Sequence, residues 1–224
     1  MNQNSLILIN YTTKIKETGE IIETTVEEVA KANKIYKEGT KYEPKLIAVG
    51  KGWILKALDE EIQKLNVGDK VTIEVTPEKA FGNRDPSKIK VIPLRKFGDR
   101  AKDVKVGDEI EYNGQIGTVI SINSGRVQVD FNDKLAGKTL VYEIEIVKEI
   151  TDLNEKIERL IRRRIDIQNP TYKVDQNKVR IEIPEQYFLT DGLQYIKRAI
   201  ASDILDIIPE INQVEFAEIY TKKQ

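Results

Sequence analysis

The stretch VGKGWILKALDEEIQKLNVGDKVTIEVTPEKAFGNRD, residues 49–85, carries the clearest periodic patterns in the chain. Its first half has apolar residues at the helical spacing of three and four: Leu55, Leu58, Ile62 and Leu65. This spacing predicts one apolar face of a short helix. A turn at 66–69 follows, and apolar and polar residues then alternate from 71 to 76, as in a half-buried strand. The two patterns together predict a sheet with a helix packed across it.

Upstream and downstream segments predict further strands of the same sheet. Residues 5–13 alternate and are β-branched, and a turn at 16–20 leads into a short second strand at 21–22. Apolar residues also alternate at Leu140, Tyr142, Ile144 and Ile146. That last strand resembles those before Pro86, so we expect a discontinuous first domain made of residues 1–86 and 135–150.

The residues between these two segments predict a small inserted β module, 87–134. Short strands are expected at 109–112, 117–122 and 126–131. They are separated by Asn113-Gly114 and Asn123-Ser124-Gly125, which are residue types that form tight hairpin turns.

Residues 151–224 predict a further α+β domain with the element order αββαβ. Asp152 and Glu155 form a capping-box pattern at the start of its first helix, and Pro209 stops the second helix. Strands are expected at 172–174, 179–183 and 214–220. The predicted fold class of the whole chain is therefore α+β.

The composition excludes several kinds of chemistry. The 224 residues include no histidine and no cysteine, with 36 basic and 37 acidic side chains. Disulfides, Cys/His zinc sites and Ser-His-Asp or Cys-His relays are excluded. No run of about 18 apolar residues suggests a membrane span, and the N-terminus lacks the pattern of a signal peptide. We expect a cytoplasmic protein with no membrane partner, no cofactor and no metal site.

Three separated blocks resemble the FKBP-type peptidyl-prolyl cis–trans isomerases, in particular the long, SlyD-like members. The first is the run 49–82, with its glycine-rich lead-in, short helix, Val-Gly-Asp turn, alternating strand and Ala-Phe-Gly. The second is INYT at 9–12 followed by TGEIIETT at 18–25, and the third is LAGKTLVYEIEI at 135–146. The resemblance implies isomerisation of X–Pro bonds in an apolar pocket, without nucleophile or metal.

The resemblance also implies which residues form the pocket. Carried over position by position, the catalytic residues are Tyr11, Ile22, Glu23, Ile54, Leu55, Leu58, Phe81 and Tyr142, and the substrate-binding residues are Leu135 and Ala136. Tyr11 and Tyr142 would be aromatic walls, and the Tyr11 hydroxyl would bond to Glu23. Leu58 would be the floor, and Ile54 and Leu55 would form the lip. Without the resemblance, the same apolar residues would be ordinary core.

Some positions depart from the family pattern. Leu58 stands where the small drug-binding members have tryptophan, and Phe81 where they have tyrosine. Phenylalanine is usual at Ile22 and aspartate at Glu23. Trp53 imitates the floor tryptophan, but it lies five residues too far from the Val-Gly-Asp turn. Isomerase activity is therefore expected to be modest, and tight macrolide binding is not expected.

The resemblance gives the module 87–134 the role of an insert-in-flap domain that binds unfolded or proline-containing polypeptides. The C-terminal domain has no recognisable site, so we expect it to serve homodimerisation. Its basic cluster, Arg159 and Arg162 to Arg164, is expected to be a solvated helix face paired with Glu155 and Glu158. This argues against a nucleic-acid partner.

Two alternatives remain open at this stage. One is a holdase that kept the scaffold but lost catalysis through Leu58 and Phe81. The other is a translation-associated nucleic-acid binder, because residues 104–131 faintly resemble a small β-barrel ribonucleoprotein module.

Overall fold

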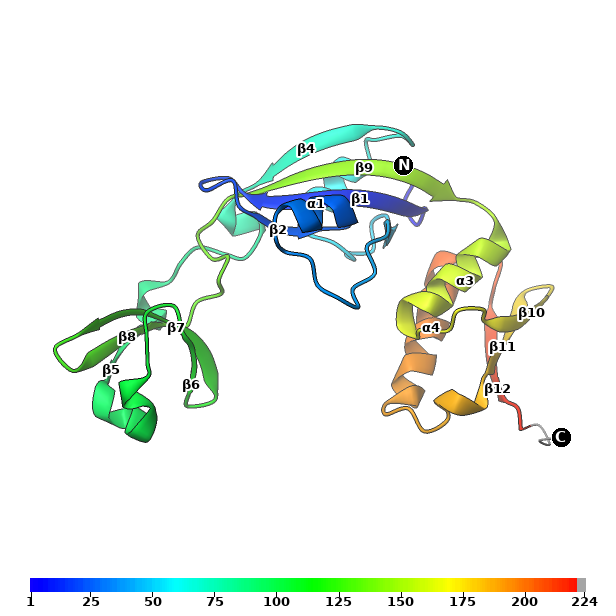
Figure 1. The fold of residues 1–224 in the computed structure, drawn as a ribbon. Helices are drawn as coiled ribbons and strands as arrows, with labels where there is room; N and C mark the ends of the chain where they lie inside the picture. The colour runs from blue at the N-terminus through cyan, green and yellow to red at the C-terminus, as the bar shows by residue number, and fades with distance from the viewer. Residues whose placement is uncertain (221–224) are drawn as a thin grey trace. The chain divides into compact units, whose positions relative to one another are not determined.

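The computed structural model describes residues 1–220 and shows a mixed α+β protein with three sheets (Figure 1). The chain divides into two compact units. The first consists of Met1–Thr13, Ile21–Ile73 and Tyr142–Gln224. The second consists of Lys14–Glu20 and Glu74–Val141. Among the described residues, no helix is long and apolar enough to cross a membrane.

The largest sheet has five strands in the order β2-β1-β9-β4, with β3 paired to β1. Their bounds are β1 Leu6–Ile15, β2 Ile21–Thr24, β3 Lys45–Ala48, β4 Lys70–Val75 and β9 Leu140–Ile150. Two short helices accompany them, α1 Glu27–Ala32 and α2 Lys56–Ile62. The helix expected from the apolar spacing is α2, although it ends before Leu65. Strand β3 was not predicted from the sequence; it pairs antiparallel with β1 from Leu6↔Ala48 to Ile9↔Lys45.

The second unit contains a four-stranded antiparallel sheet with the order β5-β8-β7-β6. The strands are β5 Ile89–Pro93, β6 Glu109–Tyr112, β7 Gln115–Asn123 and β8 Arg126–Asp130. Three 3-10 segments belong to the same unit: η1 Pro77–Lys79, η2 Pro86–Lys88 and η3 Leu94–Lys102. Both residues of the predicted Asn113-Gly114 turn have positive φ, 53° and 74°, as the tight hairpin requires. The sheet packs on a small core of its own: Ile92, Val119, Val127 and Val129.

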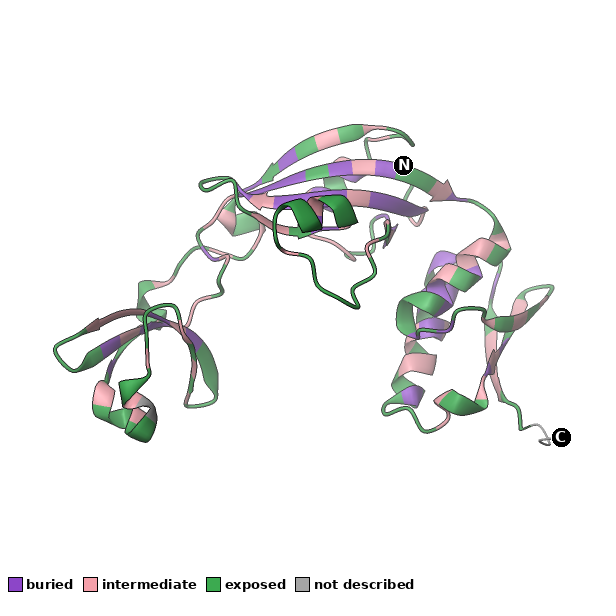
Figure 2. Cartoon of the chain, in the orientation of Figure 1, coloured by how far each residue is buried: buried purple, intermediate pink, exposed green. Residues whose placement is uncertain are grey.

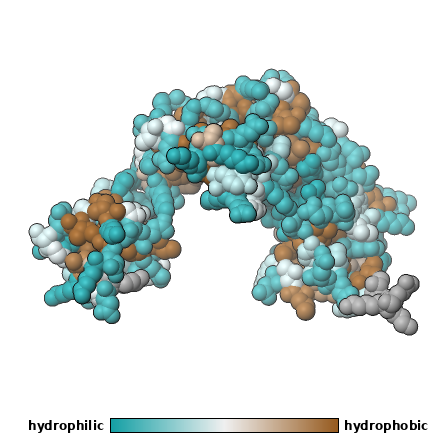
Figure 3. Space-filling view, in the orientation of Figure 1, coloured by the Kyte–Doolittle hydropathy of each residue, from teal (hydrophilic) through white to brown (hydrophobic). Residues whose placement is uncertain are grey.

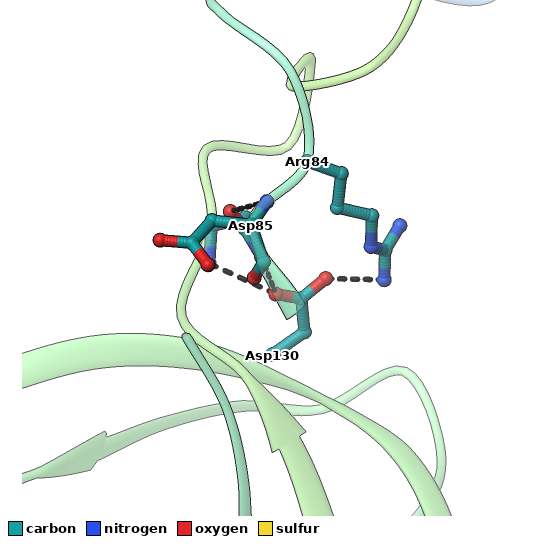
Figure 4. Close-up of polar contacts among 4 residues, drawn as sticks. Arg84, Asp85 and Asp130 are labelled. Carbon is teal, nitrogen blue, oxygen red and sulfur yellow. Dashed lines mark hydrogen bonds and ion pairs between the residues drawn. The ribbon is translucent and has the colours of Figure 1, made fainter. Parts of the chain in front are cut away.

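Polar contacts tie together the two segments that lead into and out of this sheet (Figure 4). The Asp85 N–H donates to Asn132 Oδ1 at 2.9 Å, and Asn132 Nδ2 donates back to the Asp85 carbonyl at 2.9 Å. Asn132 Nδ2 also donates to Asp130 Oδ1 at 2.7 Å, and Arg84 forms an ion pair with the same buried Asp130. We call these four residues the clasp. It fixes both connecting segments at the base of the sheet.

The C-terminal segment has the order αββαβ. Its elements are α3 Leu153–Arg164, β10 Thr171–Asp175, β11 Lys178–Ile183, a short 3-10 turn η4 Glu185–Tyr187, α4 Leu193–Ile207 and β12 Gln213–Glu218. Strand β11 pairs antiparallel with β10 and parallel with β12. The Asp152 side chain accepts a hydrogen bond from the Glu155 N–H at 2.9 Å, which caps α3.

The core of this segment is shared with the main sheet. Ile157, Leu160 and Ile161 of α3 belong to one buried cluster with Leu6 and Leu8 of β1. The apolar stripes of α3 and α4 are therefore covered within the chain itself (Figure 2).

Candidate functional site

A small pocket of about 140 Å³ opens beside the main sheet. Its lining comes from four strands, one helix and the loop before that helix: Ile9, Tyr11, Glu23, Lys45, Trp53, Ile54, Leu55, Leu58, Tyr142 and Ile144. This volume lies below the roughly 300–1,000 Å³ of sites that hold drug-sized ligands. It suits a single side chain of a longer chain.

The pocket residues are positioned by regular structure and by one pinned loop. Tyr142 and Ile144 lie two residues apart on β9, so they point to the same face of the sheet. Leu58 is buried on α2. The loop before α2 is held by buried Asp59, whose carboxylate accepts N–H bonds from Gly50 at 2.8 Å and Gly52 at 3.4 Å.

The polar edge of the pocket is a short hydrogen-bonded chain. The Tyr11 hydroxyl donates to Glu23 Oε1 at 2.5 Å, which is the bond predicted from the sequence. Lys45 Nζ donates to the Tyr11 hydroxyl at 3.3 Å and lies 5.3 Å from the centroid of the Tyr11 ring. Lys45 therefore contacts Tyr11 at both its hydroxyl and its ring, and Glu23 accepts the hydrogen bond of that hydroxyl.

Both tyrosines in the pocket stay protonated over a wide pH range. Burial raises the pKa of Tyr11 far above its ordinary value, and the hydrogen bond and charge of Glu23 raise it further. Burial, followed by the Glu23 charge, also raises the pKa of Tyr142. The cavity therefore combines two neutral phenols with apolar side chains and the charged groups of Glu23 and Lys45.

Six of the eight predicted catalytic residues line this pocket: Tyr11, Glu23, Ile54, Leu55, Leu58 and Tyr142. Ile22 instead lines a neighbouring groove of about 560 Å³. Phe81 belongs to the second compact unit, where its side chain is 42% exposed, and Leu135 and Ala136 belong to that unit too. The roles of all the predicted site residues stay predictions.

Sequence reasoning missed Lys45 and excluded Trp53. Lys45 lies on the unpredicted strand β3, and no motif marks it. Trp53 lines the same pocket as Leu58, the residue predicted to be the floor. A lone tryptophan directly after Gly50-Lys51-Gly52 was the signal that could have indicated this lining residue.

The described residues contain no group of three or more acidic, histidine or cysteine side chains arranged to hold a metal ion. What the pocket offers is apolar walls, protonated hydroxyls and main-chain amides. The Ile54 and Leu55 N–H groups donate to no partner within the described chain.

Two family models match the chain. One is described as FKBP26_C-terminal and covers residues 153–221, and the other as FKBP26, IF domain and covers residues 90–135. A short-type peptidyl-prolyl cis-trans isomerase from Methanocaldococcus jannaschii is 37% identical over 128 residues, which are 57% of this chain and 82% of that protein. The SlyD isomerase of Aeromonas hydrophila is 31% identical over 146 residues, 63% of this chain and 61% of that protein. A probable FKBP-type 16 kDa isomerase from Pseudomonas fluorescens is 26% identical over 152 residues, 66% of this chain and 90% of that protein.

Proposed function

Because this chain belongs to the FKBP-type peptidyl-prolyl cis–trans isomerases, we propose that it isomerises X–Pro bonds in the 140 Å³ pocket lined by Tyr11, Leu58 and Tyr142. The observation that carries the assignment is the meeting of six family-predicted residues around one small cavity, whose lining combines apolar side chains with a polar edge. Its substrates are proline-containing polypeptides.

The reaction needs no acid, base or metal. A planar amide is held by resonance behind a barrier of roughly 18–20 kcal/mol. As the bond twists, resonance is lost and the carbonyl becomes less polar, so water stabilises the ground state more than the transition state. An apolar pocket removes that preferential solvation and lowers the barrier.

Each lining residue has a role in this scheme. Leu58 is the floor under the proline ring, and Tyr11 and Tyr142 are its walls. The free N–H groups of Ile54 and Leu55 donate hydrogen bonds to the carbonyl of the residue before proline. Glu23 and Lys45 hold the Tyr11 hydroxyl, which keeps that ring rigid and its hydroxyl out of the proline site. Ile22, which lines the neighbouring groove, would complete the approach to the pocket.

A protease-free assay on a proline tetrapeptide tests this assignment. Leu55→Asn places a hydrated side chain on the partly exposed lip, and kcat/KM is expected to fall at least tenfold. Leu205→Asn, on the exposed surface of α4, is the matched control and should leave the rate unchanged. Chelation with EDTA should also leave it unchanged. Equal rates for both variants would refute the pocket, and an inactive wild type would favour the holdase alternative.

We propose further that residues 87–134 bind unfolded clients and so tether them to the chain that carries the pocket. Apolar side chains stand exposed on this module, with Val91 at 58%, Val106 at 63% and Ile116 at 70%, and Figure 3 has brown patches over the part that contains β5–β8. Exposed apolar surface and sheet edges suit the capture of extended chain. The acidic strand β6 does not favour nucleic acid.

We also propose a homodimer through the C-terminal segment, but the observation that supports it differs from the one that suggested it in the sequence. The apolar faces of α3 and α4 that first suggested it are covered by the chain's own core. The remaining support is a set of exposed side chains outside that core, with Leu189 at 95% and Tyr195 at 80% exposed.

A further inference from the structure

Helix α3 of the C-terminal segment reaches the wall of the proline pocket through one side chain. The Arg163 guanidinium carbon lies 3.6 Å from the centroid of the Trp53 ring. That distance is well within the range of about 6 Å in which a cation is attracted to an aromatic face. Trp53 is itself a lining residue of the pocket.

Arg163 is held in place from its other side by a buried carboxylate. Asp203 of α4 accepts a bond from Arg163 Nη1 at 3.0 Å, and from Arg164 Nε and Nη2 at 2.7 and 2.9 Å. Asp203 is one of the buried residues of α4. The predicted ion-paired face is confirmed for Arg159, whose guanidinium lies 3.8 Å from Glu155. For Arg163 and Arg164 the sequence named no partner, and both bind a residue about forty positions away.

Within the described chain, no hydrogen bond fixes the indole of Trp53. It follows Gly52, which has a positive φ of 65° and faces open space. The Asp59 carboxylate pins the backbone of this loop but touches only its glycines. The orientation of the indole ring is thus set by its packing on the shared core and by the guanidinium of Arg163.

We propose that Arg163 is a positioning residue of the isomerase site, acting through Trp53 and oriented by Asp203. The C-terminal segment then shapes substrate binding without placing any group in the pocket. This inference rests on the proposed pocket, since Trp53 must contact the substrate for Arg163 to matter. The substrate affected is any polypeptide segment whose proline occupies the pocket beside the indole.

The chain contains a matched control for this proposal. Arg163→Met and Arg164→Met each remove one arginine from Asp203, but within the described chain only Arg163 stacks on Trp53. Because Trp53 is the only tryptophan in the sequence, its emission reports this contact directly. Arg163→Met should red-shift the emission and increase its quenching by acrylamide, and Arg164→Met should not.

The kinetic expectation follows from the strength of the contact. Cation–π pairs at partly exposed sites correspond to about a two- to fivefold change in an equilibrium constant. Arg163→Met should therefore raise KM for a proline tetrapeptide by about that factor, with kcat little changed. Arg163→Lys, which keeps the charge, should recover part of both effects.

A double-mutant cycle keeps the test decisive if Arg163→Met weakens the fold. Trp53→Leu leaves the Asp203 pairs intact and should give the same rise in KM, and adding Arg163→Met to it should cause no further rise. Identical quenching and KM in Arg163→Met and Arg164→Met would overturn the proposal, as would fully additive effects in the cycle. If the tryptophan emission of the wild type does not change when a proline peptide is added, the pocket assignment is refuted. The acrylamide quenching of Arg163→Met and Arg164→Met would still test the contact between Arg163 and Trp53.

Discussion

Removal of the four-stranded sheet separates catalysis from client capture. The structure gives a clean place to cut: the Phe131 N–H donates to the Lys88 carbonyl at 3.1 Å, so the chain ends left by excising 89–130 are already adjacent. Every residue of the sheet's core lies between Ile92 and Phe131. A short Gly-Ser loop can therefore replace 89–130 and keep the Asp85–Asn132 bonds of the clasp.

The size of the effect can be worked from exposure. Complete burial of a valine or isoleucine side chain is worth about 1.5–3 kcal/mol. Val91, Val106 and Ile116 are more than half exposed, so covering each with client contributes roughly 1 kcal/mol. Three such contacts correspond to about two orders of magnitude in affinity. A client held in this way meets the pocket at a local concentration near the millimolar range.

Two assays read the consequence. Tetrapeptide isomerisation by the excised protein should stay within about threefold of wild type, because a tetrapeptide is too short to need the module. Refolding of a whole protein limited by prolyl isomerisation, which takes about 10–100 s uncatalysed, should be accelerated about 10- to 100-fold less. Suppression of aggregation should disappear.

A milder variant controls for damage to the fold. Val91→Thr with Ile116→Thr leaves the buried core of the sheet in place and should reproduce most of the refolding loss. Equal losses on the tetrapeptide and on the protein substrate would show that the module supports the pocket instead. Unchanged refolding would refute client capture by the module.

Three further predictions concern stability and assembly. The pKa of Tyr11 is raised above its ordinary 10.0, so the folded state keeps a proton that the unfolded chain releases. The free energy of unfolding, measured by urea denaturation, should therefore fall as pH rises above about 10. This fall should be less steep in Tyr11→Phe than in the exposed control Tyr195→Phe. Asn132→Ala removes three hydrogen bonds of the clasp and should destabilise the second unit by about 1–3 kcal/mol, seen as faster amide exchange in β5 and β8, whereas Asn123→Ala should not; equal protection would contradict the clasp. Sedimentation at tens of micromolar should show a dimer that Leu189→Ser with Tyr195→Ser dissociates, and a monomeric wild type would end that proposal.

Periodicity predicted the elements whose burial follows a simple repeat. Helix α4 spans Leu193–Ile207, as its apolar spacing indicates, and strand β6 has the predicted bounds Glu109–Tyr112. Strand β3 escaped because its four residues, KLIA, show no alternation. It is a strand because it forms hydrogen bonds with β1, and the local sequence of β3 does not indicate that partner.

The same limit explains what was missed in the site. Tyr11 and Glu23 belong to neighbouring segments with a recognisable motif, so their hydrogen bond was predictable. Lys45 reaches Tyr11 only through the pairing of β3 with β1. The i,i+4 rule paired Arg159 and Arg162 with glutamates one helical turn away and offered no partner for Arg163. The buried Asp203 is a stronger partner, since a desolvated carboxylate needs several donors.

Leu58 stands where the family has tryptophan, and the pocket geometry offsets the loss of that aromatic ring. A leucine floor supplies less aromatic surface than the tryptophan expected from the family, which alone would weaken the apolar cradle. Trp53 lies on the wall of the same pocket, so an indole is present beside the proline although it comes from the loop and not from α2. Trp53 follows two glycines, Gly50 and Gly52, in a loop, and a wall residue there is intrinsically more mobile than a floor residue on a helix. Desolvation catalysis depends on walls that stay in place, because every excursion of the indole admits water. If the proposal holds, the stacking of Arg163 on Trp53 limits the motion of the indole on its loop. The C-terminal segment then supplies the rigidity that a tryptophan on α2, in place of Leu58, would have from the helix itself.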